Sequence, residues 1–322
     1  MIRDRLSRFY QVMLGKSLSF VRRNTNIEGI IYFCIRYSGL PFICREVFQK
    51  NRVSILFFHA IEPQAAEVVF KYLIRNYNLI SLNEFMDIYK KKGTFPKKSL
   101  VITFDDGHKS NYDLLPVFKK YNIPVTIFLC SGIINTNRHF WFEEALYKEM
   151  HLPLTVEELK KISNGGRLKI LKGIEFGQEK EYTNPHALSK SHIHEMLPHV
   201  NFQSHTVFHP CLTQCDDREA HDEIFISKAI LEEEYGLAIN SIAYPNGDYS
   251  DRDIQLCMAA GYQFGFTTDP GFNTCHTDPF RLKRLYVNEK SNNPHELIVD
   301  VSGVTGFISR IVNYPAAQKG RA

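Results

Sequence analysis

The 322-residue sequence has no uninterrupted apolar run of the roughly 18 residues that a membrane-spanning helix needs. It also has no internal repeat and no low-complexity tract, which argues against a repeat architecture. Its seven cysteines are an odd number without a CxxC pair. A disulfide framework is therefore a poor interpretation, and a reducing compartment is favoured.

The net charge of +4 is too small to indicate a nucleic-acid partner. Residues 1–52, however, carry ten Lys or Arg against three acidic residues, so this segment is strongly basic. Arg3, Arg5 and Arg8 are not followed by the apolar run of a signal peptide. We therefore expect a cytoplasmic protein or one at the membrane periphery. The segment could contact an anionic membrane surface, or its helices could pack on the main domain.

Short apolar, β-rich runs follow one another from residue 53 onward and alternate with amphipathic stretches. Most runs are continuously apolar, as expected for parallel strands that are covered on both faces. The seven predicted strands are 54–58, 100–104, 124–129, 200–203, 241–244, 262–267 and 284–287. Helices are predicted near 82–91, after 155, and over 110–121 and 218–234. This alternation predicts an α/β fold in which the strands form a distorted (β/α)₇ barrel.

The sequence divides into three predicted parts. Residues 1–52 form a basic helical extension, 53–300 form the barrel domain, and 301–322 form a C-terminal tail. Within the barrel domain, residues 138–187 are rich in Lys and Glu and show no clear strand. We predict that they form a mostly helical insertion.

Side chains able to bind metals or transfer protons follow several of the predicted strands. In α/β barrels such positions meet at the carboxyl rim. Asp105 and Asp106 follow one strand, and Gly107 permits a sharp turn after them. Two adjacent carboxylates repel, and a cation on one of them relieves this and leaves the other free as a base. A solvated acidic turn is the alternative.

His205 and His209 follow another strand with the spacing that lets both imidazoles face one ion. Two surface histidines would be the commoner explanation of this pair alone. With a carboxylate from the same rim, the pair would make a two-histidine, one-carboxylate site with open positions. A non-haem iron oxygenase uses the same ligands, but it does not need a free second carboxylate, whereas a hydrolase does.

Three ordered motifs resemble those of the polysaccharide deacetylases, the NodB-type family also called carbohydrate esterase family four. They are TFDDG at 103–107, SHTVFHP at 204–210 and AYPNG at 243–247, within a similarity that spans roughly residues 53–290. The resemblance implies that Asp106, His205 and His209 bind one divalent ion, usually zinc. It implies that Asp105 is the general base and that the backbone N–H of Asn246 helps to hold the oxyanion.

Two positions depart from the family pattern. The family has an arginine at the start of its third motif, where this sequence has Ala243, and we expect Arg284 to supply the guanidinium that orients the base. The family's last motif provides a histidine as general acid, and nothing after residue 287 fits it. His59 follows the first strand, so a circularly permuted order would place it on the same rim as the acid. A core or structural histidine is the alternative.

Three other residues are candidates for substrate contact. Tyr244 lies in the third motif and Asp269 follows a later strand. Trp141, the only tryptophan, could stack on a sugar ring or could anchor the insertion to the barrel.

Together these features predict a metal-dependent hydrolase that acts on a linear amide, the N-acetyl group of an amino-sugar glycan. An O-acetyl carbohydrate esterase would use the same chemistry. A carbohydrate-binding homologue with an inactive site is the alternative from another class. The predicted partner is an N-acetylated glycan.

Overall fold

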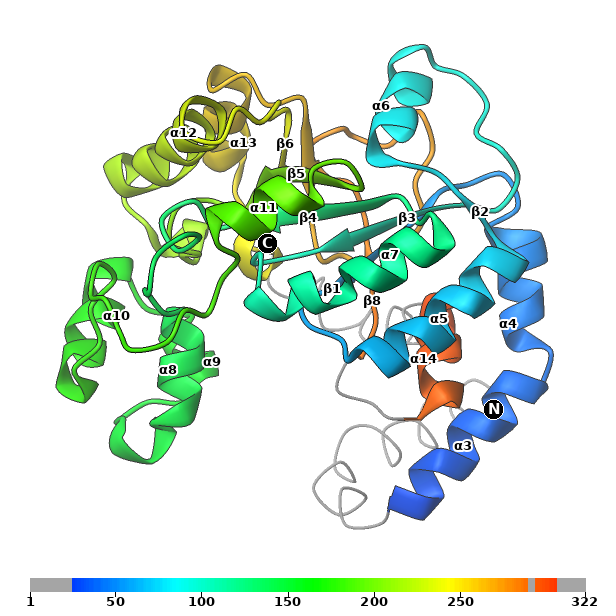
Figure 1. The fold of residues 1–322 in the computed structure, drawn as a ribbon, viewed down its shortest axis with the longest axis horizontal. Helices are drawn as coiled ribbons and strands as arrows, with labels where there is room; N and C mark the ends of the chain where they lie inside the picture. The colour runs from blue at the N-terminus through cyan, green and yellow to red at the C-terminus, as the bar shows by residue number, and fades with distance from the viewer. Residues whose placement is uncertain (1–24, 289–292, 306–322) are drawn as a thin grey trace, which may run out of the picture.

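The computed structural model describes residues 25–288 and 293–305 (Figure 1). Residues 1–24 and 306–322, which include most of the predicted tail and the segment tested for a signal peptide, lie outside the described residues. Eight strands make one sheet in the described part. They are β1 (Ser54–Phe58), β2 (Asn78–Leu79), β3 (Ser99–Phe104), β4 (Val125–Leu129), β5 (Val200–Ser204), β6 (Ser241–Ala243), β7 (Phe264–Phe266) and β8 (Leu285–Tyr286).

The strands are all parallel and follow the order β7-β6-β5-β4-β3-β1-β8. The segment 282–286 links the two ends of this order, because Leu282 bridges to Phe266 of β7 and Leu285 pairs with Leu56 of β1. The sheet therefore curls into the distorted barrel that the sequence predicts. Short β2, which the sequence did not reveal, pairs with the start of β3.

Side chains of the strands alternate between two apolar layers. Ile55, Val101 and Phe128 pack with one another inside the barrel, whereas Leu56 and Ile102 pack outward under the helices. Burial on both faces explains why the strands are apolar at nearly every position. Because each apolar run begins and ends where this burial begins and ends, the predicted strand ends agree with the structure to within two residues.

Helices cover the outside of the barrel (Figure 1). They include α5 (Pro63–Asn76), α7 (Leu115–Tyr121), α11 (Lys190–Met196), α12 (Asp217–Glu233), α13 (Asp251–Ala259) and α14 (Pro294–Val301). Helix α6 (Leu82–Lys90) differs, because Leu82, Phe85 and Met86 pack with the interior layer. Short 3₁₀ segments are η3 (Lys109–Leu114), η6 (Leu212–Gln214) and η7 (Pro245–Gly247). The helices predicted near 82–91 and after 155 begin with capping boxes, formed by Ser81 with Glu84 and by Thr155 with Glu158.

Two helical groups lie beside the barrel. The first is α3 (Thr25–Tyr37), α4 (Leu40–Ile43) and the π-helical η2 (Cys44–Phe48), which pack next to α14. The second falls within 138–187 and contains α8 (Trp141–Tyr147), η4 (Glu149–His151), α9 (Val156–Leu159), α10 (Asn164–Leu171) and η5 (Lys172–Ile174). Figure 1 shows the second group at the lower left of the view and α3 at the lower right. No helix of the described ranges is long and apolar enough to cross a membrane. The domain boundaries stay predictions.

Candidate functional site

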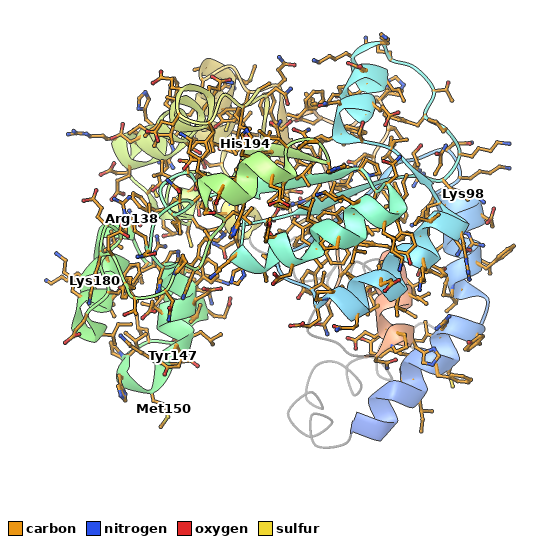
Figure 2. The ribbon with its side chains drawn as sticks, in the orientation of Figure 1. Lys98, Arg138, Tyr147, Met150, Lys180 and His194 are labelled. Atoms are coloured by element: carbon orange, nitrogen blue, oxygen red, sulfur yellow. The ribbon has the colours of Figure 1, made fainter. Side chains whose placement is uncertain are left out.

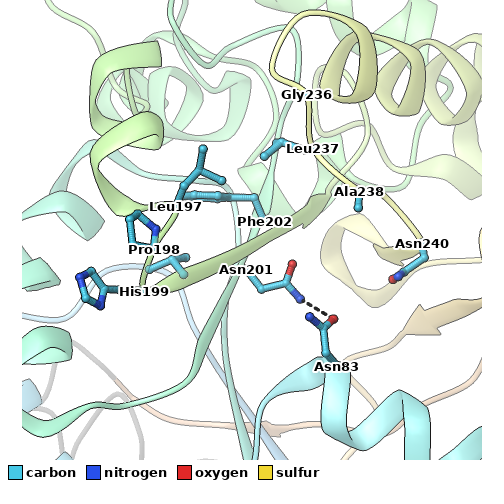
Figure 3. Close-up of a pocket in the computed structure, with 11 residues that line it drawn as sticks. Asn83, Leu197, Pro198, His199, Asn201, Phe202, Gly236, Leu237, Ala238 and Asn240 are labelled. Atoms are coloured by element: carbon cyan, nitrogen blue, oxygen red, sulfur yellow. Dashed lines mark hydrogen bonds between the residues drawn. The ribbon is translucent and has the colours of Figure 1, made fainter.

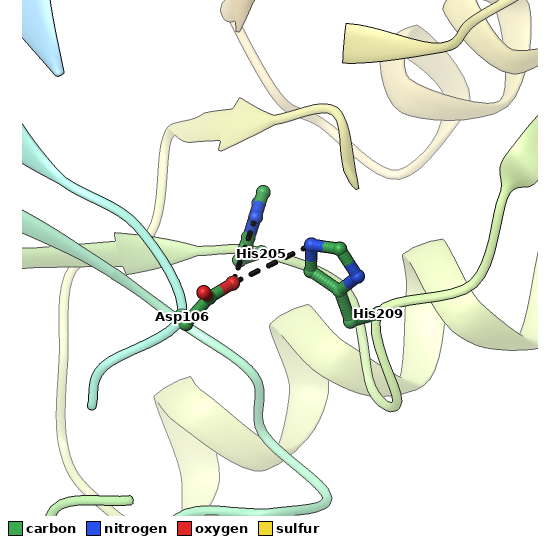
Figure 4. Close-up of side chains that lie close together, drawn as sticks. All are labelled: Asp106, His205 and His209. Atoms are coloured by element: carbon green, nitrogen blue, oxygen red, sulfur yellow. Dashed lines mark ion pairs between the residues drawn. The ribbon is translucent and has the colours of Figure 1, made fainter. Parts of the chain in front are cut away.

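Asp106, His205 and His209 come together at the carboxyl rim of the barrel (Figure 4). Oδ1 of Asp106 lies 3.4 Å from Nε2 of His205 and 3.4 Å from Nε2 of His209. All three side chains are buried, at 6% exposure or less. Two imidazole nitrogens and one carboxylate oxygen thus face a common point from two strand ends.

The backbone around this point adopts conformations that ordinary residues avoid. Asp106, Thr206 and His209 have φ values of 70°, 68° and 56°, in the left-handed region. Gly107 follows with φ 69°, and a Cβ there would lie 2.5 Å from the Leu129 side chain. Unfavourable backbone of this kind persists where the surrounding fold enforces it, and it concentrates at functional sites.

The protonation states and hydrogen bonds of these three side chains leave lone pairs available to bind a cation. Nδ1 of His205 lies 2.8 Å from the Ala243 carbonyl, which can only accept, so Nδ1 carries the proton and Nε2 presents its lone pair. Burial lowers the pKa of His209 well below its usual value, which keeps this ring neutral as a ligand must be. Oδ1 of Asp106 is buried without a hydrogen-bond partner. A divalent ion would satisfy this oxygen.

Asp105 makes a bidentate ion pair with Arg284. The two N–O distances are 2.7 and 2.8 Å, and both side chains are buried. Nε of Arg284 also donates to the Thr267 carbonyl at 2.8 Å, which fixes the guanidinium. Burial alone would raise the pKa of Asp105, but the charge of Arg284 and its hydrogen bonds to the carboxylate outweigh it, so the pKa lies below its usual value. The structure therefore places an ionised carboxylate next to Asp106.

His59 lies on the same rim, directly after β1. The Asp105 N–H donates to the carbonyl of Phe58, the residue before His59, at 2.8 Å, and Nδ2 of Asn111 donates to the His59 carbonyl at 2.8 Å, so His59 lies beside the Asp105–Asp106 turn. The ring packs near Phe57, with 5.9 Å between centroids, and remains half-buried. The side chain is thus not a residue of the sealed core.

The third motif is only partly placed as predicted. Asn246 lies in the rim loop with a left-handed φ of 56°, and its Nδ2 is 3.5 Å from Sγ of Cys211. Tyr244 is fully buried and its hydroxyl donates to the Phe280 carbonyl at 3.1 Å. Contrary to the prediction, Tyr244 is therefore not placed to contact a substrate. Tyr244 directly follows the end of β6, and its ring packs in the layer under the helices.

Asp269 contributes through its main chain. Its carbonyl accepts from the Arg284 N–H at 3.1 Å, and its own N–H donates to Oγ1 of Thr267 at 3.1 Å. The residue is exposed. It helps to position Arg284, and contact of its carboxylate with a substrate stays a prediction.

Trp141 anchors the insertion to the barrel. The side chain is only 2% exposed, and Nε1 donates to the His209 carbonyl at 2.8 Å. The guanidinium of Arg167 covers the ring at 4.4 Å. Of the two alternatives that the sequence left open, the geometry favours the anchor, because no ring face is free for a sugar.

Replacing Trp141 by phenylalanine tests this anchor. The variant keeps the ring but leaves the His209 carbonyl without its donor, which we expect to reduce the free energy of unfolding by about 1–3 kcal/mol. The KM for a glycan should stay unchanged, because the ring does not touch substrate. Chemical denaturation and steady-state kinetics measure the two effects. A raised KM with unchanged stability would show that stacking is the correct role.

Glu223 was missed by the sequence reasoning. It lies on α12, and its Oε2 accepts from the backbone N–H of Val207 at 2.7 Å and of Phe208 at 2.9 Å. These bonds hold the loop between His205 and His209. A charged residue on an otherwise apolar helical face was the only available signal. Burial raises the pKa of Glu223 to about 7.

This raised pKa predicts a pH-dependent stability. Between about pH 4.5 and 7 the folded state keeps a proton that the unfolded state has lost, so stability from this group falls as pH rises. Glu223→Gln mimics the protonated form, so the wild type should lose roughly 3 kcal/mol relative to it between pH 4.5 and 8. Denaturant melts at several pH values measure this difference. Glu233→Gln, at an exposed position of α12, is the control, and parallel wild-type and Glu223→Gln profiles would contradict the assignment.

Glu143 was also missed, and it borders the site from α8. Its carboxylate lies 3.2 Å from Nε2 of His108 and 2.6 Å from Nδ1 of His186. Burial would raise its pKa, but hydrogen bonds from the two histidines lower the pKa to about 2. Its neighbour Phe142 packs on the ring of His209, with 4.8 Å between centroids. The insertion therefore forms one wall of the site, which no local pattern in the sequence indicates.

A second group of potential ligands, His139, Glu144 and His186, lies in the insertion. The two imidazoles are stacked in parallel, 3.5 Å apart with 11° between their planes. Because a nitrogen lone pair lies in its ring plane, one ion cannot lie in both planes at bonding distance. Both nitrogens of His139 also have partners, Glu144 at 2.6 Å and the Asn184 carbonyl at 2.7 Å. This group fits a structural contact better than a metal site.

A hollow of about 400 Å³ lies at the other end of the barrel (Figure 3). It is lined by residues that lead into β5 and β6, among them His199, Asn201 and Asn240. Asn83 and Asn201 form a hydrogen bond of 3.3 Å across it. Since the ligand cluster follows the carboxyl end of β5, this hollow is not part of the candidate active site.

The comparisons with known proteins agree with this geometry. A family model described as polysaccharide deacetylase matches residues 92–265, more than half of the chain. The chain belongs to the polysaccharide deacetylase family. It is 30% identical over 222 residues to the poly-β-1,6-N-acetyl-D-glucosamine N-deacetylase of Staphylococcus epidermidis, an alignment that covers 68% of this chain and 64% of that one. The Staphylococcus aureus protein of the same name is 24% identical over 211 residues, with 65% and 61% covered.

The chain thus spans less than two thirds of the length of these curated relatives. Among solved structures, the Streptococcus pyogenes deacetylase PplD in complex with acetate has a TM-score of 0.57 at 21% identity, covering 78% of this chain and 99% of that one. IcaB from Ammonifex degensii has a TM-score of 0.56 at 18% identity, covering 79% and 98%. At these identities the likeness shows the shared fold of the family.

Proposed function

We propose that this member of the polysaccharide deacetylase family is a metal-dependent hydrolase that removes N-acetyl groups from an amino-sugar glycan. One observation supports this most strongly. An ionised, arginine-bound Asp105 lies next to a buried ligand set of Asp106, His205 and His209. In a hydrolase, a metal ion held by such ligands activates a water molecule, and a neighbouring carboxylate that does not bind the ion accepts the proton of that water.

Asp106, His205 and His209 would hold one divalent ion, most naturally zinc, which accepts nitrogen and oxygen ligands in a site with an open position. When bound, such an ion polarises an acetyl carbonyl and lowers the pKa of a coordinated water. The chain prepares for it by keeping His209 neutral and by fixing the tautomer of His205 through Ala243.

Asp105 would act as the general base. It accepts the proton of the attacking water, and the Arg284 guanidinium holds the carboxylate in place and keeps it ionised before attack. Arg284 is thus a positioning residue that acts through Asp105. The backbone N–H of Asn246 would donate to the oxygen that becomes negative as the tetrahedral centre forms.

His59 would act as the general acid. It lies on the rim on the β1 side and is half-buried, so it can meet both substrate and the cluster. Protonation of the sugar nitrogen by His59 lets the carbon–nitrogen bond break, which leaves acetate and a free amine. The two proton transfers therefore use side chains from different strands, β1 and β3.

The relatives indicate which substrate to test first. Both staphylococcal relatives are named for poly-β-1,6-N-acetyl-D-glucosamine, so we propose an N-acetylglucosamine-containing chain as substrate. The Streptococcus pyogenes deacetylase was solved in complex with acetate, and acetate is the product that such a reaction would release here.

Acetate release over a panel of N-acetylated and O-acetylated glycans tests the proposal, with and without a chelator. We expect release from N-acetylglucosamine oligomers that a chelator abolishes and added zinc restores. Release only from O-acetylated glycans would show an esterase instead. A protein that binds these oligomers without releasing acetate would be an inactive carbohydrate-binding homologue.

A further inference from the structure

The N-terminal helices carry an unusual concentration of exposed apolar side chains. In the described part of the chain, seventeen large apolar residues are exposed, and eight of them fall between residues 30 and 48. They are Ile30, Phe33, Tyr37, Leu40, Phe42, Ile43, Val47 and Phe48, with exposures from 39% to 64%. We call this set the N-terminal apolar face. Surfaces of this kind usually mark contact with a partner or a membrane.

Helix α3 is apolar on two sides. One side, with Tyr32 and Ile35, packs against a cluster formed by Cys44, Val299 and Val304 next to α14. This packing accounts for one apolar stripe, which is all that a surface helix ordinarily has. Ile30, Phe33 and Tyr37 form a second stripe at helical spacing, and it remains half exposed. Phe33 and Tyr37 also contact the His295 ring of α14, at 5.2 and 5.9 Å between centroids, yet they stay 50% and 64% exposed, so docking on the barrel accounts for only part of the second stripe.

Cations lie directly on this face. The guanidinium of Arg36 lies 5.3 Å from the centre of the Tyr37 ring, and that of Arg45 lies 5.5 Å from the centre of the Phe42 ring. Lys50 and Arg52 are exposed just after η2. Arginine beside exposed aromatic rings is the side-chain mixture of helices that lie at a membrane interface.

We propose that the N-terminal apolar face lies in the plane of an anionic lipid surface. The aromatic and aliphatic side chains would enter the boundary between headgroups and acyl chains, and the exposed cations Lys50 and Arg52 would bind phosphate groups. This proposal concerns where the protein works and does not depend on the chemistry at the barrel rim.

The positive charge of the N-terminal segment favours an anionic lipid surface over a second copy of the chain or residues 1–24 as the partner of this face. Residues 1–52 carry ten Lys or Arg against three acidic residues, so face-to-face pairing of two copies would bring like charges together. Residues 1–24 carry six Lys or Arg and one acidic residue, so their net charge has the same sign as that of the N-terminal apolar face, and they would repel it if they covered it. An anionic lipid surface has the opposite sign. Glu46 is the one acidic side chain of η2, and Arg45 and Lys98 already pair with it.

Co-sedimentation of the full chain with vesicles tests the proposal. We expect binding to phosphatidylcholine vesicles that contain phosphatidylglycerol, weaker binding to pure phosphatidylcholine, and loss of binding in high salt. The triple variant Phe33→Ser, Phe42→Ser, Val47→Ser should reduce the vesicle partition coefficient at least about tenfold.

A matched control removes three exposed apolar side chains elsewhere. Tyr147 and Met150 are labelled at the far end of the insertion in Figure 2, and with Leu146 they are 59–97% exposed. The variant Leu146→Ser, Tyr147→Ser, Met150→Ser should keep vesicle binding. Both variants should keep the wild-type unfolding midpoint and acetate release from soluble oligomers, which separates this test from that of the catalytic proposal.

Three results would overturn the proposal. The first is a wild-type chain that stays in the supernatant with anionic vesicles. The second is equal loss of binding in both triple variants. The third is a wild-type dimer that the Phe33, Phe42 and Val47 substitutions convert to a monomer without any vesicle binding, which would assign the face to a second copy.

Discussion

Replacing Asp105 by asparagine is expected to lower kcat by about 10²–10⁴-fold, the usual contribution of a positioned general base. Asparagine has nearly the same shape but cannot take the proton of the attacking water. The Asp106, His205 and His209 side chains are unchanged, so the metal content should stay at the wild-type value. Acetate release under saturating substrate, with metal analysis of the same preparation, measures both quantities.

The matched control for this prediction is Asp113→Asn, which makes the same chemical change at an exposed position of η3. It should keep wild-type kcat. If Asp105→Asn kept full activity, Asp105 would not be the base. If Asp105→Asn lost its metal, the carboxylate would belong to the ligand set instead.

Replacing Arg284 by methionine is expected to reduce both stability and activity strongly. Arg284 is fully buried against Asp105, so the variant leaves a buried carboxylate without its partner. Breaking one side of such a pair typically costs about 3–5 kcal/mol. We expect a loss of that size in the free energy of unfolding, and a reduced kcat because the base is no longer held. Denaturant melts and steady-state kinetics measure the two effects.

The double variant Asp105→Asn, Arg284→Met separates the ion pair from general disruption. With both charges removed, it should regain a large part of the stability that Arg284→Met alone loses, because no buried charge remains unpaired. Its activity should not recover, since the base is absent. Additive losses of stability in the double variant would show that the two residues do not act as a pair.

The fold was predictable because burial on both sides of a parallel sheet makes each strand a compact apolar run. The run LVITF before Asp105 shows this, with Val101 facing the barrel interior and Ile102 facing the helices. Strand β2 was not predictable, because its two residues, Asn78 and Leu79, are too few to show a pattern. Its existence depends on pairing with β3.

The grouping of the site was predictable where a motif fixes it locally. Asp105 and Asp106 are adjacent, and His205 and His209 share one loop. Arg284 was inferred from a missing arginine at Ala243, and its place on Asp105 is a contact across 179 residues that only the folded chain shows.

The roles of other residues were missed or left open because local sequence does not show burial. Tyr244 and Trp141 are polar-tipped aromatic residues near motifs, and both turn into packed layers where their polar atoms bind backbone carbonyls. Glu223 and Glu143 resemble ordinary surface glutamates in sequence. Their contacts to the His205–His209 loop and to His108 arise from packing of α12 and α8 on the rim.

The central claim is that Asp106, His205 and His209 hold one divalent ion, and titration of zinc into the chelator-treated protein tests it most directly. Calorimetry should show one zinc ion per wild-type chain, no binding of comparable affinity to His209→Ala, and wild-type binding to His139→Ala. Wild-type zinc binding by His209→Ala, or its loss in His139→Ala, would contradict the assignment.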